Sequence, residues 1–370
     1  MILKPMLVCS LAVLSGAASA HAGEVKAAWQ VEWERTQVAA KREGRVVVYF
    51  WQGGNLEKAL KAFQRKYPEI GLNTVGGRGS DFVARISSEL RAGKHLADVC
   101  ICGVTSPYKV LYTQKALEPL KPVFLLPEVA DESKWWKGKH HFQDPEGRYI
   151  FVFWGRAAAT RISYNSKAVS SDELKSHWDL LEPKWKRKIV AIDPNESTGG
   201  WRGLYYKPGL GPEYLTRLFR EAEIIFTRAD RQAVDWLATG KFALGLFLAA
   251  ITEAKAQGLP VDEFNDSSFK ELPNLDSGPN GTLVLLKQAP HPNAAKLFVN
   301  WFLSREGQTA YQEIMNTPLD QAESMREDIP KDPVPEPYRR RKGVEYVQMF
   351  TPDRMDAEPV LRLFKETVKR

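Results

Sequence analysis

A glycine- and hydroxyl-rich stretch precedes an amphipathic segment in the first quarter of the sequence. The residues GGRGSD are followed by FVARISSEL, in which apolar side chains recur at helical spacing. The first turn of a helix carries unpaired backbone N–H groups and the positive end of the helix dipole. Arg78, Gly79 and Ser80 beside such a turn could hold an anion. The stretch equally fits a helix whose N-cap is Ser80 or Asp81, so both interpretations stay open.

A second loop of the same kind, NESTGGW, follows an apolar run that ends at Ile192. Ser197, Thr198 and Gly199 supply hydroxyl and backbone donors there, and a capped helix start is again the alternative. If the two loops belong to different lobes, their donors lie on opposite sides of one ligand site. We therefore favour a binding role for the pair.

Aromatic and cationic side chains accompany the same predicted strand ends. Aromatic rings often line ligand clefts, and arginine pairs with carboxylate or phosphate through two parallel hydrogen bonds. Arg78, Arg156 and Arg202 favour an anionic ligand over a polyamine, because these strand ends lack paired acidic residues. The residues that we predict to bind the ligand are Trp51, Gln52, Arg78, Gly79, Ser80, Thr105, Ser106, Trp154, Arg156, Ser197, Thr198, Gly199 and Trp201.

Patterns typical of catalysis or metal binding are missing from the sequence, which contains no H-E-x-x-H, G-x-S-x-G or G-x-x-x-x-G-K-[ST] motif. His140 and His141 are adjacent, so on a strand they point in opposite directions and make a poor chelate. Cys100 and Cys102 alternate along a predicted strand, where we expect two buried thiols rather than a disulfide or a metal site. The sequence predicts a protein that is not an enzyme and has no cofactor.

The N-terminus predicts export to the periplasm. The segment MILKPMLVCSLAVLSGAASAHA contains one lysine, a short apolar run and two possible A-x-A cleavage sites, so we assign residues 1–22 to a secretory signal peptide. The net charge of +7 favours capture of anionic small molecules. The basic cluster at residues 339–342 lacks interleaved aromatic residues, and we expect no nucleic-acid partner.

Strand, loop and helix patterns alternate along the chain and predict two α/β lobes. The loops that follow parallel strands meet at the carboxyl edge of the sheet, where open sheets bind ligands. We predict strands at residues 45–50, 68–73, 97–103, 161–165, 188–192, 242–247 and 282–286. The predicted division is a first lobe at 23–105, a second lobe at 106–274, a returning part of the first lobe at 275–315, and a C-terminal helical or tail segment at 316–370.

Several separated stretches together resemble one known family. LEKALKAFQRKYPEI and GGRGSDFVARISSEL resemble the first lobe of bacterial extracellular solute-binding proteins of the ferric-iron ABC-transporter type, WDLLEPKWKRKIVAIDP resembles their second lobe, and HPNAAKLFVNWFLSREGQ their returning segment. The resemblance implies a type II periplasmic binding protein, in which two α/β lobes are joined by a hinge and the ligand binds between them. It also implies an inner-membrane ABC permease as partner, and we expect a monomer.

One position departs from that family. Ferric-binding members carry adjacent tyrosines after the strand that here reads ALGLFLAA, where this sequence has Phe247 and Leu248. The only tandem tyrosines, Tyr205 and Tyr206, lie elsewhere. Because ferric iron needs anionic oxygen ligands, we predict instead a phosphorylated or carboxylated organic anion. Ferric iron with a synergistic anion is the alternative ligand, and a secreted enzyme on a two-lobed scaffold is the alternative of another class.

Overall fold

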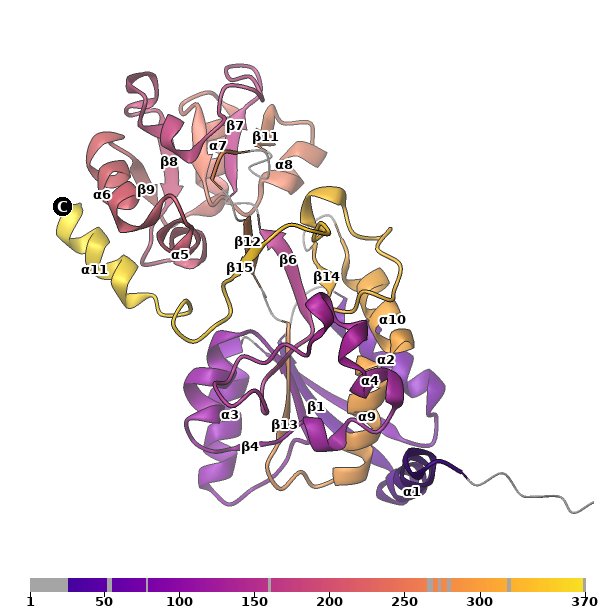
Figure 1. Ribbon diagram of the computed structural model, residues 1–370. Helices are drawn as coiled ribbons and strands as arrows, with labels where there is room; N and C mark the ends of the chain where they lie inside the picture. Colours follow the sequence, from indigo (N-terminus) through magenta and orange to yellow (C-terminus); the bar gives the residue numbers. More distant parts are fainter. Residues whose placement is uncertain are drawn as a thin grey trace, which may run out of the picture.

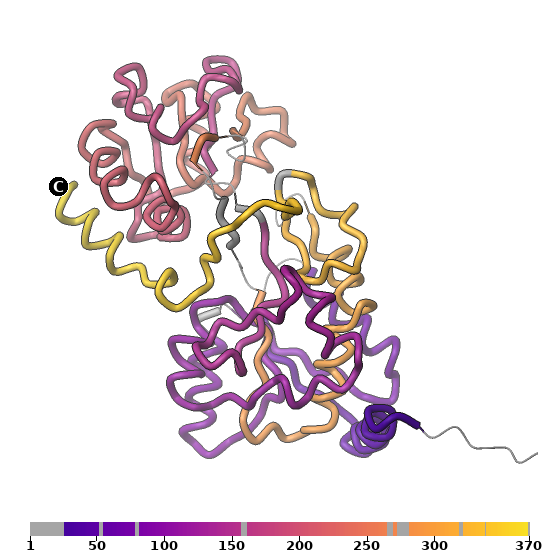
Figure 2. The backbone as a smooth tube through the Cα atoms, viewed as in Figure 1, coloured from indigo at the N-terminus to yellow at the C-terminus, as the bar shows by residue number. Residues whose placement is uncertain are grey.

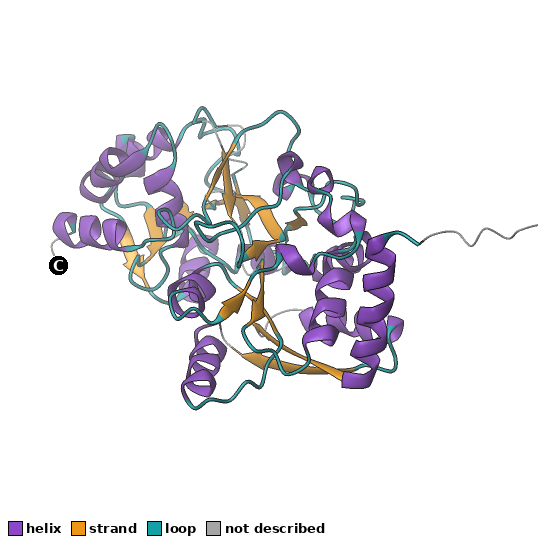
Figure 3. Cartoon of the chain, turned by 60° about the horizontal axis from the view of Figure 1, so that its bottom comes forward, coloured by secondary structure: helices purple, strands orange, loops and turns teal. Residues whose placement is uncertain are grey.

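The protein folds into two α/β lobes joined by a narrow sheet, as Figure 1 shows in this computed structural model. The two-lobed α/β architecture expected from the sequence is confirmed. In Figure 3 many of the helices lie on the outer sides of the strands. The structure describes residues 26–51, 55–77, 79–158, 161–264, 269–271, 274–277, 281–317 and 321–368. The predicted signal peptide, Gln52 and Arg78 lie outside these ranges.

The first-lobe sheet runs in the order β2, β1, β3, β13 and β4, with β5 also paired to β13. β1, β2 and β3 are parallel, whereas β13 is antiparallel to its neighbours. The near-continuous apolar run of β1 fits a strand that is covered on both faces. The strands are β1 (Arg45–Trp51), β2 (Gly71–Gly77), β3 (Val99–Cys102), β4 (Leu117–Glu118), β5 (Phe151–Val152) and β13 (Thr282–Leu286).

Successive side chains of this sheet enter two different cores, because they point to opposite faces. Val48 and Ile101 pack with one set of helices, whereas Tyr49 and Cys100 pack with another. The first set is α1 (Ala28–Glu43), α2 (Leu56–Lys66), α9 (Pro292–Leu303) and α10 (Arg305–Met315), and the second is α3 (Gly79–Arg91) and η1 (Pro107–Tyr112). Cys100 and Cys102 are buried free thiols whose Sγ atoms lie 3.1 Å apart.

The first lobe extends further along the chain than the sequence predicted. Residues 117–152 contribute β4 and β5 to the first-lobe sheet, although we expected the second lobe to begin at residue 106. Each of these strands is only two residues long, too short to produce a recognisable alternation. The same stretch contains α4 (Pro127–Ala130), η2 (Lys121–Val123), η3 (Glu132–Lys134) and η4 (Trp136–Gly138).

The second lobe is built on a sheet in the order β11, β7, β10, β8 and β9. β8, β9 and β10 are parallel, and β7 is antiparallel to β10 and β11. The strands are β7 (Ile162–Asn165), β8 (Ile189–Ile192), β9 (Ile225–Thr227), β10 (Leu244–Leu246) and β11 (Val261–Glu263). The helices are η5 (His177–Leu181), η6 (Pro183–Trp185), α5 (Gly199–Tyr206) and α6 (Gly211–Glu221), which share one core, and α7 (Asp230–Ala238) and α8 (Ile251–Ala256), which share the other.

A third sheet lies between the lobes and connects them, in the order β14, β6, β12 and β15. β6 leads from the first lobe to β7 in the second lobe, and β12 leads back to β13. The chain thus passes between the lobes along neighbouring strands, an arrangement that suits a hinge. The strands are β6 (Trp154–Ala158), β12 (Asn274–Ser277), β14 (Glu323–Ser324) and β15 (Tyr346–Gln348).

The C-terminal part of the chain makes a third passage between the lobes. β15 pairs with β12, and the chain then continues to α11 (Glu358–Thr367), which lies on the second lobe (Figure 2). The ring of Phe364 in α11 is 5.3 Å from that of Phe219 and 5.0 Å from that of Phe226. We call residues 346–367 the C-terminal connection. Among the described residues, none of the helices is both long and apolar enough to span a membrane.

Candidate functional site

The carboxyl ends of the first-lobe strands adjoin the connecting sheet. Cys102, the last residue of β3, pairs with Thr282, the first residue of β13, which the chain reaches directly from β12. β1 and β2 run parallel to β3 and end at the same edge, at Trp51 and Gly77. The carboxyl ends of these strands therefore face the connecting sheet and the second lobe (Figure 1).

The second lobe presents the corresponding edge to the first. Leu246 at the end of β10 pairs with Ile162 at the start of β7, which the chain reaches from β6. β8 and β9 are parallel to β10, so Ile192 and Thr227 end at this edge too. Ligand sites of open α/β sheets lie at such carboxyl edges. The region between the two edges is the candidate functional site.

The predicted first-lobe residues that the structure describes lie at this edge. Trp51 is half-buried between two cores, and its Nε1 has no hydrogen-bond partner among the described residues. Thr105 and Ser106 are half-buried in the helical turn that leads into η1. Gly79 and Ser80 begin α3, whose N-terminus follows β2.

The loop after β8 in the second lobe is held by Asp193. The Oδ1 atom of Asp193 accepts hydrogen bonds from the backbone N–H of Asn195 at 2.9 Å and from its side-chain amide at 2.8 Å. This loop leaves Ser197 and Gly199 exposed and Thr198 half-buried at the N-cap position of α5. The Thr198 hydroxyl makes no capping hydrogen bond to α5, so it remains available for other hydrogen bonds.

Two of the predicted tryptophans are packed inside the protein. Trp201 is fully buried, and its Nε1 donates a 2.9 Å hydrogen bond to the carbonyl oxygen of Ile192. Trp154 is buried with its ring centre 4.8 Å from that of Tyr311. Arg156, also in β6, is half-buried and places its guanidinium 5.9 Å from the ring centre of Tyr338. Trp154 and Trp201 thus form part of the framework behind the edges.

The stretch after β10 has Phe247 and Leu248 where the family resemblance led us to expect tandem tyrosines. Phe247 has a φ of +64°, which is unusual for a residue with a side chain, and its ring centre lies 4.5 Å from that of Trp201. The next backbone N–H groups, of Ala249 and Ala250, donate to the carboxylate of Asp230 at 2.7 and 3.0 Å. This stretch therefore contacts α5 through Trp201 and is hydrogen-bonded to the first residue of α7.

The tandem tyrosines and Arg202 lie on α5 against the C-terminal connection. The Tyr206 hydroxyl donates to the carbonyl oxygen of Asp353 at 3.0 Å, and Nη1 of Arg202 donates to that of Arg354 at 3.1 Å. Burial raises the pKa of Tyr206 and lowers the pKa of the Arg202 guanidinium. No local sequence pattern predicts these contacts, because the partners are about 150 residues apart along the chain.

The same segment of the C-terminal connection also contacts the first lobe. The side-chain amide of Gln143 donates to the carbonyl oxygen of Val104 and contacts Sδ of Met355. Val104 lies in the loop after β3, directly before Thr105. Residues 354–355 therefore stand between α5 of the second lobe and a strand-end loop of the first.

Metal-binding clusters are not found in the part of the chain that the structure describes, which contains no group of three or more His, Cys, Asp or Glu side chains placed to hold an ion. His140 and His141 bond separate backbone carbonyls, those of Val129 at 3.0 Å and Trp136 at 2.7 Å. Their nitrogens thus contribute to the packing of the first lobe.

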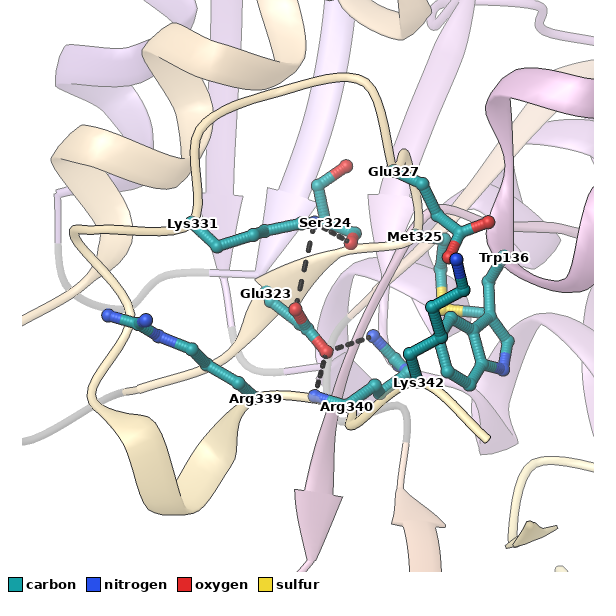
Figure 4. A pocket seen from close by; sticks show the side chains of 9 residues that line it. All are labelled: Trp136, Glu323, Ser324, Met325, Glu327, Lys331, Arg339, Arg340 and Lys342. Atoms are coloured by element: carbon teal, nitrogen blue, oxygen red, sulfur yellow. Dashed lines mark hydrogen bonds and ion pairs between the residues drawn. The ribbon is translucent and has the colours of Figure 1, made fainter. Parts of the chain in front are cut away.

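A pocket of about 170 Å³ lies beside the connecting sheet, between Trp136 and residues 323–342 (Figure 4). Its buried Glu323 pairs with Nη1 of Arg340 at 3.1 Å and with Nζ of Lys331 at 3.6 Å. Burial lowers the pKa of Lys331 to about 8. The central charges of this pocket are therefore compensated within the protein.

The chain belongs to the bacterial extracellular solute-binding proteins, whose sequence profile matches residues 52–309. The protein is thus a solute-binding component of the ABC-importer type, which confirms the family expected from the sequence. Among curated sequences, an uncharacterized protein of Haemophilus influenzae is 25% identical over 283 residues, covering 73% of this chain and 76% of its own.

Solved structures with the same fold include three proteins with bound ligands. Iron-bound HitA from Pseudomonas aeruginosa is 20% identical over 88% of this chain and 99% of its own, with a TM-score of 0.58. Trichodesmium IdiA (FutA) with iron and citrate is 18% identical over 88% and 100%, with a TM-score of 0.63. AfuA from Actinobacillus pleuropneumoniae with fructose-6-phosphate is 21% identical over 87% and 97%, with a TM-score of 0.52. These similarities confirm the type II periplasmic binding protein fold.

Proposed function

We propose that this protein works in the periplasm as a monomer and captures a small organic anion, phosphorylated or carboxylated, for an inner-membrane ABC permease. The observation that carries the proposal is the pair of helix starts at the two facing edges. α3 begins after β2 in the first lobe, and α5 begins after the β8 loop in the second. The hydroxyl of Thr198, at the N-cap position of α5, makes no capping hydrogen bond. Helix N-termini and hydroxyl groups both favour anionic oxygen.

In this proposal the predicted residues divide into two roles. The buried Trp154 and Trp201 support the site from behind, and the other predicted residues contact the ligand. A ligand held by both edges stabilises the closed arrangement of the lobes, because only that arrangement allows contacts from both sides. The permease then recognises the closed form. The ligand is released unchanged, without a catalytic step. The contact residues are Trp51, Gln52, Arg78, Gly79, Ser80, Thr105, Ser106, Arg156, Ser197, Thr198 and Gly199.

Native mass spectrometry of protein purified without refolding tests the proposal. We expect a bound species of a few hundred daltons or less, which tandem mass spectrometry identifies as a carboxylate or phosphate ester. A neutral sugar, a cationic amine or a chemically altered product of an added solute would contradict it.

Ferric iron with a synergistic anion is the second candidate ligand, because two structural neighbours hold iron and one of these also holds citrate. Phe247 weighs against it, since a phenyl ring offers no oxygen ligand. The mass of the native complex distinguishes the two candidates directly.

A further inference from the structure

Arg202 is a half-buried arginine whose Nε atom is fully buried. It lies in α5 at the edge of the second lobe that faces the first. Its Nη1 donates to the carbonyl oxygen of Arg354, while its Nε atom is buried and has no hydrogen-bond partner among the described residues. Among the described residues, none of the carboxylates forms an ion pair with this guanidinium, and Asp356 acts on its charge only from beyond that distance.

Two fully or nearly fully buried arginines have close carboxylate partners. Arg326 is fully buried and bonds the carboxylate of Asp328 through both Nε and Nη2, at 2.8 and 2.7 Å. Arg340 pairs with Glu323 at 3.1 Å (Figure 4). A buried charge without a counter-ion is unfavourable, and proteins pair nearly all of them. Arg202, although only half-buried, has no such close counter-ion among the described residues.

The position of Arg202 limits where such an anion can come from. Its partner Arg354 is next to Met355, which contacts Gln143 of the first lobe. Gln143 in turn bonds the carbonyl oxygen of Val104, beside Thr105. A small anion at Arg202 would thus lie between the two lobes, on the side of the first lobe that carries Thr105.

We infer that the Arg202 guanidinium binds a carboxylate or phosphate group of the solute and receives from it the missing counter-charge. This inference rests on the proposed capture of an organic anion and adds the residue that selects for negative charge on the second-lobe side. Carboxylate and phosphate each present two anionic oxygens to a guanidinium. Arginine can therefore bind either group through two parallel hydrogen bonds.

The test is calorimetric titration with two probes, inorganic phosphate and citrate, on the wild type and on Arg202→Met. We expect the wild type to bind at least one probe and Arg202→Met to bind it about tenfold to 100-fold more weakly. The probe that binds distinguishes phosphate from carboxylate chemistry. Equal affinity in the two proteins, or no binding of either probe by the wild type, would overturn the inference.

Two further variants separate ligand binding from structure. Tyr206→Phe removes the adjacent hydrogen bond to the C-terminal connection and keeps the guanidinium, so its affinity for the probe should stay within about twofold of the wild type. Without probe, Arg202→Met should lower the melting temperature less than Arg326→Met, which strands an acidic partner. A larger fall for Arg202→Met would show that its charge is already compensated. If Arg202→Met binds normally while native mass spectrometry finds an anion, the proposed function stands and only this inference fails.

Discussion

Gly200 lies directly against the ring of Phe247, so closely that a Cβ atom on Gly200 would sit 2.0 Å from a ring carbon. This contact joins the first turn of α5 to the residue after β10. It fixes the height of α5 above the second-lobe sheet, and with it the positions of Thr198 and Arg202.

Gly200→Ala should destabilise the protein by about 1–3 kcal/mol, because the added methyl group overpacks a site bounded by a buried aromatic ring. Gly199→Ala is the matched control, since a Cβ there meets nothing within 4 Å. In the same helix it should stabilise by up to about 0.5–1 kcal/mol. Urea unfolding measures both. Equal effects of the two variants would mean that Phe247 moves aside.

Thr198→Val should leave the free energy of unfolding within about 0.5 kcal/mol of the wild type, because the hydroxyl makes no capping hydrogen bond. If the hydroxyl binds an anionic ligand, the same change should weaken affinity by about 1.5–3 kcal/mol. Thermal melts and calorimetric titration with the solute found by native mass spectrometry give the two numbers. Loss of stability with normal affinity would identify Thr198 as a helix cap only.

Ferric citrate should produce no phenolate-to-iron charge-transfer band in the visible spectrum. The reason is that Phe247 replaces the expected tyrosine, while the Tyr206 hydroxyl already bonds the backbone of Asp353. A strong band that disappears when both Tyr205 and Tyr206 are changed to Phe would contradict this and would reinstate iron as the ligand.

Ligand binding should bring the lobes together. The three passages of the chain between the lobes allow relative rotation, and a ligand that contacts both edges favours closure. Small-angle X-ray scattering should therefore give a smaller radius of gyration with the solute found by native mass spectrometry than without it. An unchanged radius at saturation would rule out hinge closure.

Acid should destabilise the second lobe through Glu271. Burial acts to raise the pKa of Glu271, but hydrogen bonds from His177 and Ser176 outweigh it and lower the pKa to about 2, from an ordinary value of 4.5. A carboxylate with a depressed pKa stabilises the fold fully above 4.5, and this contribution is lost as the pH falls towards 2. Glu271→Gln should therefore be less stable than the wild type at pH 7, and the difference should shrink below pH 4. Chemical unfolding across this range measures it. A difference that stays constant with pH would show that the carboxylate is not responsible.

Local periodicity was sufficient to predict many individual elements. Apolar residues recur at helical spacing in α2 (Leu56–Lys66) and in α9 (Pro292–Leu303), so both helices can be predicted from the sequence. In both helices the buried residues make the helical spacing recognisable in the sequence. The strand expected at 45–50 is β1, since a run of β-branched and aromatic residues suits a buried strand.

Pairings between distant segments could not be predicted in this way. The C-terminal connection was expected only as a helical tail, because β15 is three residues long and acquires its role by pairing with β12 about 70 residues earlier. The sequence likewise could not show whether Trp201 points into the lobe or towards the ligand site, because a short helix pattern does not tell which face is buried. Packing against Phe219 and Phe247 decides that the indole points inward.

The strand order of the first lobe constrains how the exported chain can fold. β13 lies between β3 and β4 in the sheet, yet it is preceded in the sequence by the whole second-lobe sheet. Because β13 follows the second lobe in the sequence, one edge of β3 stays unpaired until the chain as far as Leu286 is available. Such edges pair readily with other chains. Until β13 joins the sheet, a partly folded molecule therefore exposes an edge at β3 that another chain can pair with.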